Sequence, residues 1–339
     1  MNRQELANAF LKEAGWQDAM IAPLAGDASN RRYDRVSRPD GQSAVLMDAD
    51  PAKGEDVRPF VKIAQFLKQH GLSAPDILHA DPKTGFLLIE DLGDRLFATE
   101  VANDPEQERQ LYEAAVDVLT ALHQVKPPPL LTYDAKTTVP LAGLAYDWYQ
   151  FGAIGAVDMD QKAQFSDAFF KIIRQFDSSL TVLIQRDYHA ENLLWLPDRE
   201  GTARVGLLDF QDAMIGHPVY DLVSVLQDAR RDVSGQIERH MMERFLANSG
   251  LEPRAFNIAY SVFGAQRNLR ILGVFARLCL RDAKPHYVDL IPRVWRHLQT
   301  NLSHPILAPV AELIRNDLPE PNTALLSHIK NKSGTCSSL

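Results

Sequence analysis

Residues 184–213 read IQRDYHAENLLWLPDREGTARVGLLDFQDA, and this stretch decides the fold. Its two short apolar runs, LLWL and VGLL, flank a loop rich in proline, aspartate and glycine. This pattern predicts a β-hairpin, although the loop is longer than the commonest hairpin loops. In an antiparallel hairpin, the residue that enters the first strand lies beside the residue that leaves the second. We therefore expect Asn192 and Asp209 to meet at the open end of the hairpin, with Asp187 one turn upstream.

These three side chains predict a magnesium site with a separate base. Asn192 and Asp209 offer oxygen ligands, which suit magnesium, an ion that usually keeps several waters and also binds substrate phosphates. Asp187 would then accept the proton of an attacking hydroxyl. Kinases use the same order of Asp, four residues, Asn and a later Asp that binds magnesium. Each residue alone could equally cap a turn or a helix, but the three in order around a hairpin favour catalysis.

Length and composition set the broad class. At 339 residues the chain is long for one compact core, so two lobes are expected. A formal net charge of −8 argues against nucleic-acid binding, and no apolar run reaches the roughly 18 residues that span a bilayer. The first residues carry no signal-peptide pattern, and Cys279 and Cys336 are too isolated to indicate a disulfide framework or a zinc site. We expect a cytoplasmic, monomeric enzyme that acts on a small molecule.

The amino-terminal part has the pattern of a small sheet. Strands and one helix alternate with turn signals and are expected at residues 21–24, 31–36, 43–47, 56–70 (the helix), 77–80 and 86–89. A hinge is expected next, where backbone groups of Glu90 and Leu92 could hydrogen-bond an adenine.

The segment GDASN lies between the first two predicted strands. Backbone amides at this place could cover the phosphates of a nucleotide, with Gly26, Ser29 and Asn30 as the candidate residues. The segment has only one glycine, so an ordinary hairpin turn is an equal alternative.

The rest of the chain is predicted to be helical. The pattern predicts a core helix at 106–123 and helices to about residue 318, followed by a frayed tail at 331–339. A further helix is expected to begin at about Val219, with Asp221 in its first turn. We interpret Asp221 as a structural residue that holds the catalytic loop through buried hydrogen bonds.

Two groups of side chains are candidates for binding the acceptor. Tyr146 and Trp148 belong to an aromatic cluster that could stack on a sugar ring, although an amphipathic helix packed on the core explains such clusters more often. Arg267 lies on a predicted helix with an apolar face, where basic residues are usually solvated. Contact with an anionic substrate is the alternative.

The chain resembles the aminoglycoside phosphotransferase and choline kinase branch of the protein-kinase-like fold over nearly its whole length. The string QRDYHAENLLW carries this resemblance, and LAGDASNRRYDRV and GVFARLCLRDAKPHYVDLIPRVWRHL make the chain most similar to the anomeric N-acetylmuramate and N-acetylglucosamine kinases of cell-wall recycling. The resemblance implies an α+β, two-lobed fold with a mostly antiparallel nucleotide-binding lobe at 1–92 and a helical lobe at 93–330. It also implies ATP as a substrate, magnesium on Asn192 and Asp209, and Asp187 as the base.

The sequence departs from the family pattern at three places. Gln185 stands where the branch usually has histidine, and the third strand offers Met47 and Asp48 in place of the phosphate-binding lysine. Successive side chains of a strand face opposite ways, so we expect either Arg31 or Arg32 to replace that lysine. Gln211 stands where many relatives hold glutamate, which leaves Asp212 as the nearest carboxylate for the substrate or a second metal.

The sequence therefore predicts an ATP-dependent kinase that phosphorylates the anomeric hydroxyl of N-acetylmuramate, N-acetylglucosamine or both, in peptidoglycan recycling. Two alternatives stay open. One is a kinase of the same fold that acts on an aminoglycoside, choline or homoserine. The other is a nucleotide-binding pseudokinase, which the missing lysine would suggest. The presence of Asp187, Asn192 and Asp209 together favours catalysis.

Overall fold

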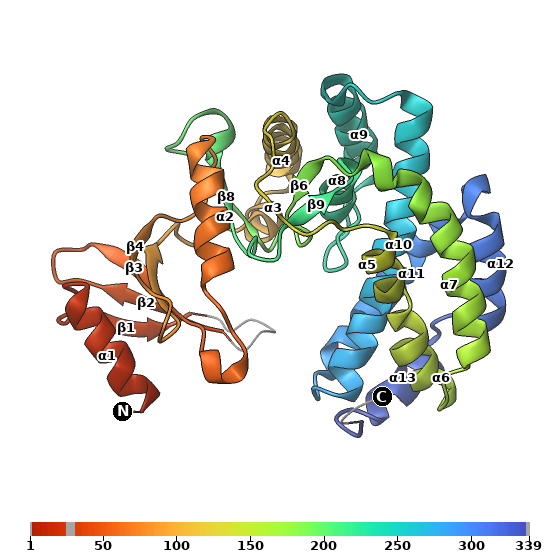
Figure 1. The fold of residues 1–339 in the computed structure, drawn as a ribbon, viewed down its shortest axis with the longest axis horizontal. Coiled ribbons are helices and arrows are strands. Elements are labelled where there is room, and N and C mark those ends of the chain that lie inside the picture. Colours follow the sequence, from red (N-terminus) through yellow and green to blue (C-terminus); the bar gives the residue numbers. More distant parts are fainter. Residues whose placement is uncertain (1, 25–30, 337–339) are drawn as a thin grey trace. The chain divides into compact units, whose positions relative to one another are not determined.

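The computed structural model describes residues 2–24 and 31–336, which divide into two compact units (Figure 1). The first unit contains Met1–Val118 and Ala190–Ala213, and the second contains Leu119–His189 and Met214–Leu339. An antiparallel sheet in the first unit and helices elsewhere confirm the predicted α+β class. The predicted lobes at 1–92 and 93–330 remain a prediction, since these units follow a different boundary.

The first unit is built on a five-stranded sheet in which every pair of neighbouring strands is antiparallel. Its strand order is β1-β2-β3-β5-β4, and α2 connects β3 to β4. The strands and the helix lie within one or two residues of the predicted positions: β1 (Met20–Pro23), β2 (Arg32–Ser37), β3 (Ser43–Asp48), α2 (Arg58–Gln69), β4 (Ile77–Asp81) and β5 (Phe86–Glu90).

Helix α1 (Arg3–Glu13) covers one face of this sheet. Its buried residues Ala7, Phe10 and Leu11 pack in one cluster with Val36, Ala44, Leu46, Phe86 and Leu88. Because side chains alternate along a strand, the residues between these face the other side of the sheet. The strand register places Tyr33, Arg35, Val45 and Met47 together on that second face.

The predicted hairpin is present in the first unit. Strand β7 (Leu193–Trp195) pairs with β8 (Val205–Leu207), and a single turn of 3-10 helix (Gly201–Arg204) closes the loop between them. Each strand is one residue shorter than predicted. On either side of the hairpin in the sequence, β6 (Val182–Ile184) and β9 (Met214–Gly216) form a second short ladder, which belongs to the second unit.

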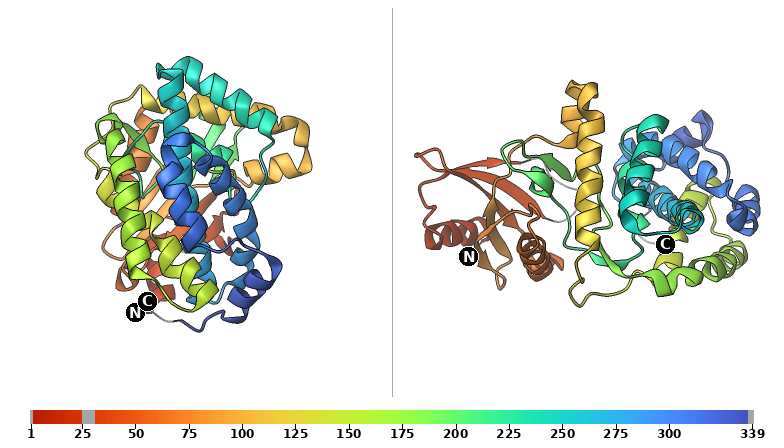
Figure 2. Two further views of the ribbon diagram at one scale, coloured as in Figure 1. Left: turned by 90° about the vertical axis from the view of Figure 1, so that its right-hand side faces the viewer. Right: turned by 90° about the horizontal axis from the view of Figure 1, so that it is seen from above.

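The second unit is a helical assembly around α10 (Pro253–Leu280), and Figure 2 shows its helices from two further directions. Helices α11, α8, α5 and α13 and the π-helical segment Ala145–Gln150 contact α10, while α7 packs on α5 and α12. The bounds are α4 (Glu108–His123), which begins in the first unit, α5 (Ala135–Ala142), α6 (Phe151–Ile154), α7 (Met159–Ile173), α8 (Val219–Leu226), α9 (Gly235–Ser249), α11 (Ile291–Leu302), α12 (Ala308–Asp317) and α13 (Thr323–Asn331). A short α3 (Phe97–Asn103) precedes α4 in the first unit.

Two glycines let other segments approach α10 closely. A Cβ on Gly273 would lie 2.2 Å from the backbone carbon of Leu144, and a Cβ on Gly264 would lie 2.5 Å from Oδ1 of Asn301 on α11. At Gly273 the obstructing atoms belong to the backbone, so this close approach requires glycine, whereas at Gly264 the side chain of Asn301 would have to shift to admit a Cβ.

The carboxyl-terminal residues differ from the predicted frayed tail. Residue 331 ends α13, and beyond it Gly334 N–H donates to the carbonyl of Cys279 at 3.0 Å and Cys336 N–H donates to that of Leu280 at 3.1 Å. The last carbonyls of a helix have no partner within it, so this segment satisfies the end of α10. Residues 337–339 lie outside the described part of the chain.

Candidate active site

The open end of the hairpin brings two of the predicted site residues together. Asn192 Nδ2 donates to Asp209 Oδ2 at 3.5 Å, and the backbone N–H of Leu208 donates to the carbonyl of Asn192 at 3.0 Å. The predicted meeting of Asn192 and Asp209 is therefore confirmed within the first unit. Asp209 has a φ of 56°, a left-handed conformation that is uncommon outside glycine and is often kept at functional sites.

The donor set at this end suits magnesium. The pair supplies one amide oxygen and one carboxylate, and the shell of magnesium is commonly completed by water and substrate phosphates. Among the described residues, no group of three or more His, Cys, Asp or Glu side chains could hold a metal by itself. A cation here would take the rest of its shell from water and a phosphate-bearing substrate, as in phosphoryl-transfer enzymes.

Gln211 has a role that the sequence did not predict. Its Nε2 donates to Asp209 Oδ1 at 2.6 Å, and the glutamine is 7% exposed. An amide N–H fixes the orientation of Asp209 where glutamate would repel it. Asp212, the next residue, is exposed and remains a candidate for contact with the substrate or a second metal.

Asp187 lies in the second unit, beside cations of α10. Arg270 NH2 is 3.7 Å from Asp187 Oδ2. Burial opposes ionisation of Asp187, but the charges of Arg270 and Arg267 outweigh it and hold its pKa below the ordinary value. The carboxylate is therefore ionised at neutral pH and can accept a proton. Arg270 was not among the predicted site residues, although its spacing of three from Arg267 places both on one face of a helix.

The loop that carries Asp187 is held by Asp221. The two carboxylate oxygens of this fully buried residue accept the backbone N–H of Gln185 at 2.6 Å and that of Arg186 at 3.0 Å. Burial raises the pKa of Asp221 to about 7, against the opposing effect of the two N–H donors. Arg186 has a φ of 73°, so the loop keeps a strained residue next to the candidate base. The structural interpretation of Asp221 is confirmed.

The side chain of Gln185, which stands where the branch usually has histidine, does not hold the catalytic loop. Its Nε2 is buried and has no hydrogen-bond partner in the part of the chain that the structure describes. The backbone contacts with Asp221 hold the loop in its place, and these contacts do not depend on which side chain residue 185 carries.

Arg267 is buried, in contrast to the solvated arginine that its sequence context favoured. It is 2% exposed, and its NH1 donates to the carbonyl of Gln227 at 3.4 Å. Gln227 is itself part of a buried amide network: Asn268 Nδ2 and Asn301 Nδ2 donate to its Oε1 at 2.9 and 2.8 Å. Burial lowers the pKa of Arg267, an effect that Tyr220, Asp187 and other neighbours offset only in part. A further anion beside Arg267 would lower the cost of burying its charge.

The predicted nucleotide-binding residues divide into three groups. Gly26, Ser29 and Asn30 lie outside the described residues. Arg31 and Arg32 are described, and their side chains contact different carboxylates, Glu55 and Asp34.

The third group is the hinge pair. The backbone N–H of Glu90 donates to Asp76 at 2.8 Å, and the Glu90 side chain pairs with Arg199 at 2.5 Å. Any adenine contact at Glu90 would therefore fall to its carbonyl. Leu92 is half-buried against Gly206 of β8, and the hydrogen bond of its backbone with an adenine stays a prediction.

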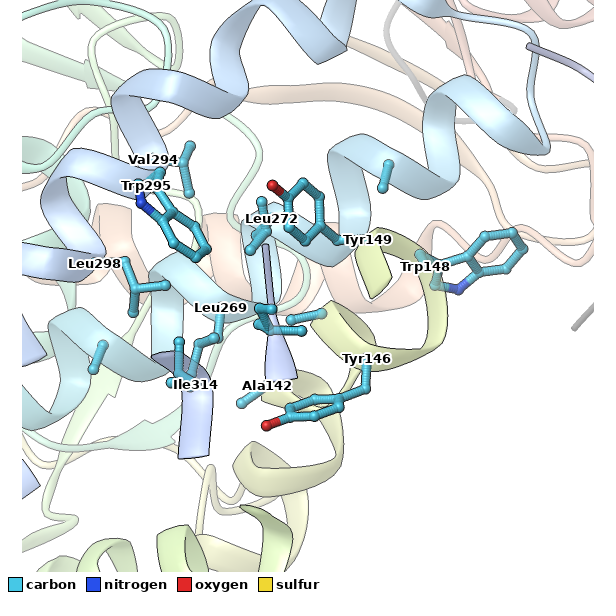
Figure 3. Close-up of a cluster of buried hydrophobic side chains, with 14 of the residues drawn as sticks. Ala142, Tyr146, Trp148, Tyr149, Leu269, Leu272, Val294, Trp295, Leu298 and Ile314 are labelled. Carbon is cyan, nitrogen blue, oxygen red and sulfur yellow. The ribbon is translucent and has the colours of Figure 1, made fainter. Parts of the chain in front are cut away.

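Tyr146 and Trp148 are core residues, which corrects the prediction that they bind the substrate. Figure 3 shows them in the aromatic segment that packs with Leu269 and Leu272 of α10. Tyr146 is fully buried, and its hydroxyl donates to Asp317 Oδ2 at 2.8 Å. Trp148 is 6% exposed. The sequence pattern was compatible with stacking on a sugar ring and with an amphipathic helix packed on the core, and the burial of both side chains favours the helix.

No helix of the described residues is long and apolar enough to cross a membrane. The sequence pattern of the phosphotransferase enzyme family matches residues 21–256. The chain is 39% identical to the N-acetylmuramate/N-acetylglucosamine kinase of Caulobacter vibrioides, with 90% of this chain and 94% of that protein covered. It is 34% identical to the protein of the same name from Pseudomonas aeruginosa, with 93% and 94% covered.

Solved structures extend the similarity to the fold. Choline kinase LicA from Streptococcus pneumoniae superposes with a TM-score of 0.62 at 11% identity, covering 87% of this chain and 99% of that one. The aminoglycoside phosphotransferase APH(2'')-Ib bound to ADP gives 0.60 at 12% identity, covering 89% and 98%. At these identities the likeness shows the fold alone.

Proposed function

Because the chain belongs to the phosphotransferase enzyme family, we propose that it is a kinase that transfers the γ-phosphoryl group of ATP to the anomeric hydroxyl of N-acetylmuramate, N-acetylglucosamine or both. The observation that carries the proposal is the pairing of Asn192 with Asp209 at the end of the hairpin, in a chain similar over nine-tenths of its length to kinases of that name. The activity would place the protein in the recycling of peptidoglycan sugars.

Asp187 accepts the proton in this mechanism. The anomeric oxygen attacks the γ-phosphorus, the bond from that phosphorus to the β,γ-bridging oxygen breaks, and ADP leaves with the bond's electron pair. The proton of the sugar hydroxyl passes to Asp187. An anomeric hydroxyl is more acidic than other sugar hydroxyls, so an ionised carboxylate is a sufficient base. The contacts of Asp221 with the backbone of Gln185 and Arg186 hold that base in position.

Asn192 and Asp209 are proposed to hold magnesium, with Gln211 orienting the carboxylate. Bound magnesium would neutralise charge on the transferring phosphoryl group. Little covalent chemistry is required of the protein, because positioning and electrostatic stabilisation supply most of the rate in phosphoryl transfer.

The acceptor preference is proposed to depend on the cations of α10. N-acetylmuramate carries a lactyl carboxylate that N-acetylglucosamine lacks. Arg267, which is buried, and Arg270, which is half-buried, supply two guanidinium groups close to Asp187, and the charge of Arg267 is only partly balanced. We propose that Arg267 contributes to binding the muramate carboxylate.

A substrate panel tests the function. The purified protein is assayed with magnesium and ATP against N-acetylmuramate, N-acetylglucosamine, kanamycin, choline and homoserine, and the product linkage is determined by phosphorus NMR. We expect a sugar 1-phosphate from one or both amino sugars. Phosphorylation of another alcohol alone would replace the proposed acceptor, and intact ATP binding without any transfer would indicate a pseudokinase.

The role of Arg267 has its own test. Arg267→Gln should raise the KM for N-acetylmuramate more than the KM for N-acetylglucosamine, since only the first sugar has a carboxylate. Arg277→Gln, a change on the same helix α10, is the matched control and should leave the ratio of the two KM values unchanged. An equal rise for both sugars would show that Arg267 has only a structural role.

A further inference from the structure

We propose that Arg31, held by Glu55, binds the phosphates of the nucleotide in place of the lysine that β3 lacks. The inference rests on the proposed function in one respect, namely that a nucleoside triphosphate is the phosphoryl donor. It adds the residue that binds this donor and chooses between two adjacent arginines that the sequence could not separate.

Strand β3 has no cation on either face. It reads SAVLMD, and its last two residues, Met47 and Asp48, are 1% and 6% exposed. Asp48 accepts a hydrogen bond from Arg3 Nε of α1 at 2.7 Å, so it belongs to the face that α1 covers. Met47 belongs to the opposite face and has no charge. A cation for the phosphates must therefore come from an element other than β3.

The register of the sheet separates Arg31 from Arg32. Arg32 is paired with Asp48 across the β2–β3 ladder, and its side chain contacts Asp34 at 3.0 Å and Asp48 at 3.8 Å. These contacts keep Arg32 on the α1 face, where its side chain is 51% exposed. Arg31 directly precedes this strand and is directed to the second face, the one that carries Tyr33.

Arg31 is fixed by a largely buried ion pair. Its Nε lies 2.8 Å from Glu55 Oε2, and the two side chains are 13% and 14% exposed. Burial by itself lowers the pKa of Arg31, but Tyr33, Glu55 and Asp212 more than offset that effect and raise it above the ordinary value. Asp212 thus lies close enough for its charge to act on Arg31.

The same neighbourhood contains the proposed magnesium ligand. Asp212 follows Asp209 by three residues, and Phe210 between them packs on Phe60 of α2 with 4.7 Å between ring centroids. Glu55 lies just before α2. Two independent connections, one electrostatic and one through packing, therefore place Arg31 and Glu55 beside the segment that carries Asp209, all within the first unit.

The chemistry of the pair fits a phosphate site. A guanidinium has five N–H donors in a planar fork, so a bond from Nε to a carboxylate is compatible with binding phosphate oxygens through the same group. Glu55 limits the rotamers of Arg31 before the nucleotide binds, which reduces the entropy lost on binding. The Arg31–Glu55 pair thus takes the place of a lysine–glutamate ion pair, with the cation just before β2 instead of on β3.

Nucleotide binding in the absence of sugar tests the inference. Dissociation constants for ATP, ADP and adenosine are measured by calorimetry with magnesium for the wild type, Arg31→Gln, Arg31→Lys, Glu55→Gln and Arg32→Gln. Arg31→Gln should weaken ATP and ADP binding by about tenfold to a hundredfold, the usual scale for a hydrogen bond to a charged group, and leave adenosine binding unchanged. Arg31→Lys should recover part of the loss.

Arg32→Gln is the matched control, because it removes the same charge one residue away. It should change ATP affinity less than twofold. Equal losses in both variants, an ATP affinity unchanged by Arg31→Gln, or a parallel loss of adenosine binding would each overturn the inference. Glu55→Gln should weaken ATP binding less than Arg31→Gln and keeps the test valid if the arginine variant does not fold.

The two proposals fail in different ways. If the wild type binds ATP but transfers phosphate to none of the sugars, the proposed function fails while the comparison of Arg31 with Arg32 still decides this inference. If the sugars are phosphorylated and Arg31→Gln binds ATP normally, only the inference fails.

Discussion

In the first unit, arginines pair with carboxylates around a sheet, whereas in the second unit polar side chains are buried among helices. Arg35 of the first unit contacts Asp91 and Asp94 at 2.7 Å each, with its side chain 26% exposed. In the second unit, Gln227 and Asn301 form an amide network in which both are at most 3% exposed. Partly exposed ion pairs contribute little to stability, but a buried polar group must keep its partners.

The difference extends to the proposed chemistry. The first unit supplies Asn192, Asp209 and Arg31, which are suited to a metal and phosphates. The second supplies Asp187 and the arginines of α10, which are suited to the reacting hydroxyl and its carboxylate. We therefore expect changes in the first unit to affect mainly the nucleotide, and changes in the second to affect stability, the acceptor and the proton transfer.

The largest expected effect is acid destabilisation of the second unit. Burial is the main cause that lowers the pKa values of His189, His217 and His297 to about 4 and that of His123 to about 3. The unfolded chain takes up these protons below about pH 6.5, whereas the folded unit does so only near pH 4. Their stabilisation is complete above pH 6.5 and is lost as the pH falls toward 4, on the order of 3 kcal/mol for each histidine.

Tryptophan fluorescence can follow each unit separately. Trp16 and Trp195 belong to the first unit, and Trp148 and Trp295 to the second. In each of two double variants, one pair of tryptophans is replaced by phenylalanine, so that the remaining pair reports urea unfolding of its own unit. The unfolding is measured at pH 7, 6, 5 and 4. The midpoint of the second unit should fall more steeply with acidification. An equal change of the urea midpoint with pH in the two units would contradict the expected difference in their acid sensitivity.

The next largest effect is on turnover. Asp187→Asn removes the base and should lower kcat by roughly two to four orders of magnitude, the usual scale for general-base loss, while the affinity for magnesium ATP stays near that of the wild type. Asp209→Asn should raise the magnesium concentration needed for half-maximal rate. Steady-state kinetics across a magnesium series separates the two. Normal turnover by Asp187→Asn would show that another group accepts the proton.

A smaller effect is expected from overpacking the second unit. Gly273→Ala places a Cβ 2.2 Å from the backbone of Leu144 and should lower the free energy of unfolding by about 1–3 kcal/mol. Gly235→Ala in α9 is the control, because its Cβ would meet its nearest atom, on Arg239, at an ordinary 3.5 Å. Chemical denaturation measures both, and equal stability of the two variants would mean that α10 and the neighbouring segment can move apart easily.

Asp221→Asn tests the support of the catalytic loop. An asparagine has one acceptor oxygen, so one of the two backbone N–H groups, of Gln185 or Arg186, loses its acceptor. We expect a loss of about 1–3 kcal/mol in the free energy of unfolding together with a lower kcat. The carboxyl has a raised pKa, so its contribution to stability is present below pH 4 and declines as the pH rises through about 7. The wild type's stability relative to the variant should therefore fall over that range.

The smallest effect belongs to an exposed ion pair of the first unit. Arg109 and Glu113 are four residues apart on α4 with 2.8 Å between Nε and Oε1, and the arginine side chain is 64% exposed. Arg109→Ala should change the free energy of unfolding by less than about 0.5 kcal/mol. A fall of more than 1 kcal/mol in the free energy of unfolding, measured by chemical denaturation, would show that exposed ion pairs stabilise the first unit more than we expect.

Local patterns gave much of the fold and part of the site. The strand alternation, the turn residues and the order Asp187, Asn192 and Asp209 are short-range features, and the hairpin they predict is present. Arg270, Gln211 and the burial of Tyr146 could not be read from them. Each depends on which residues distant in the sequence pack beside it, and an aromatic or basic residue on a helix face looks the same in sequence whether it is buried or exposed.

The sequence by itself determined the class of protein, the antiparallel sheet followed by helices, and the residues proposed to carry phosphoryl transfer, because periodicity and motif spacing act over a few residues. Only the tertiary structure decided which of Arg31 and Arg32 takes which side of the sheet, with Glu55 beside Arg31 and Asp34 beside Arg32. The physical reason is that strand alternation guarantees opposite faces, whereas the packing of α1 and the register with β3 decide what each face meets.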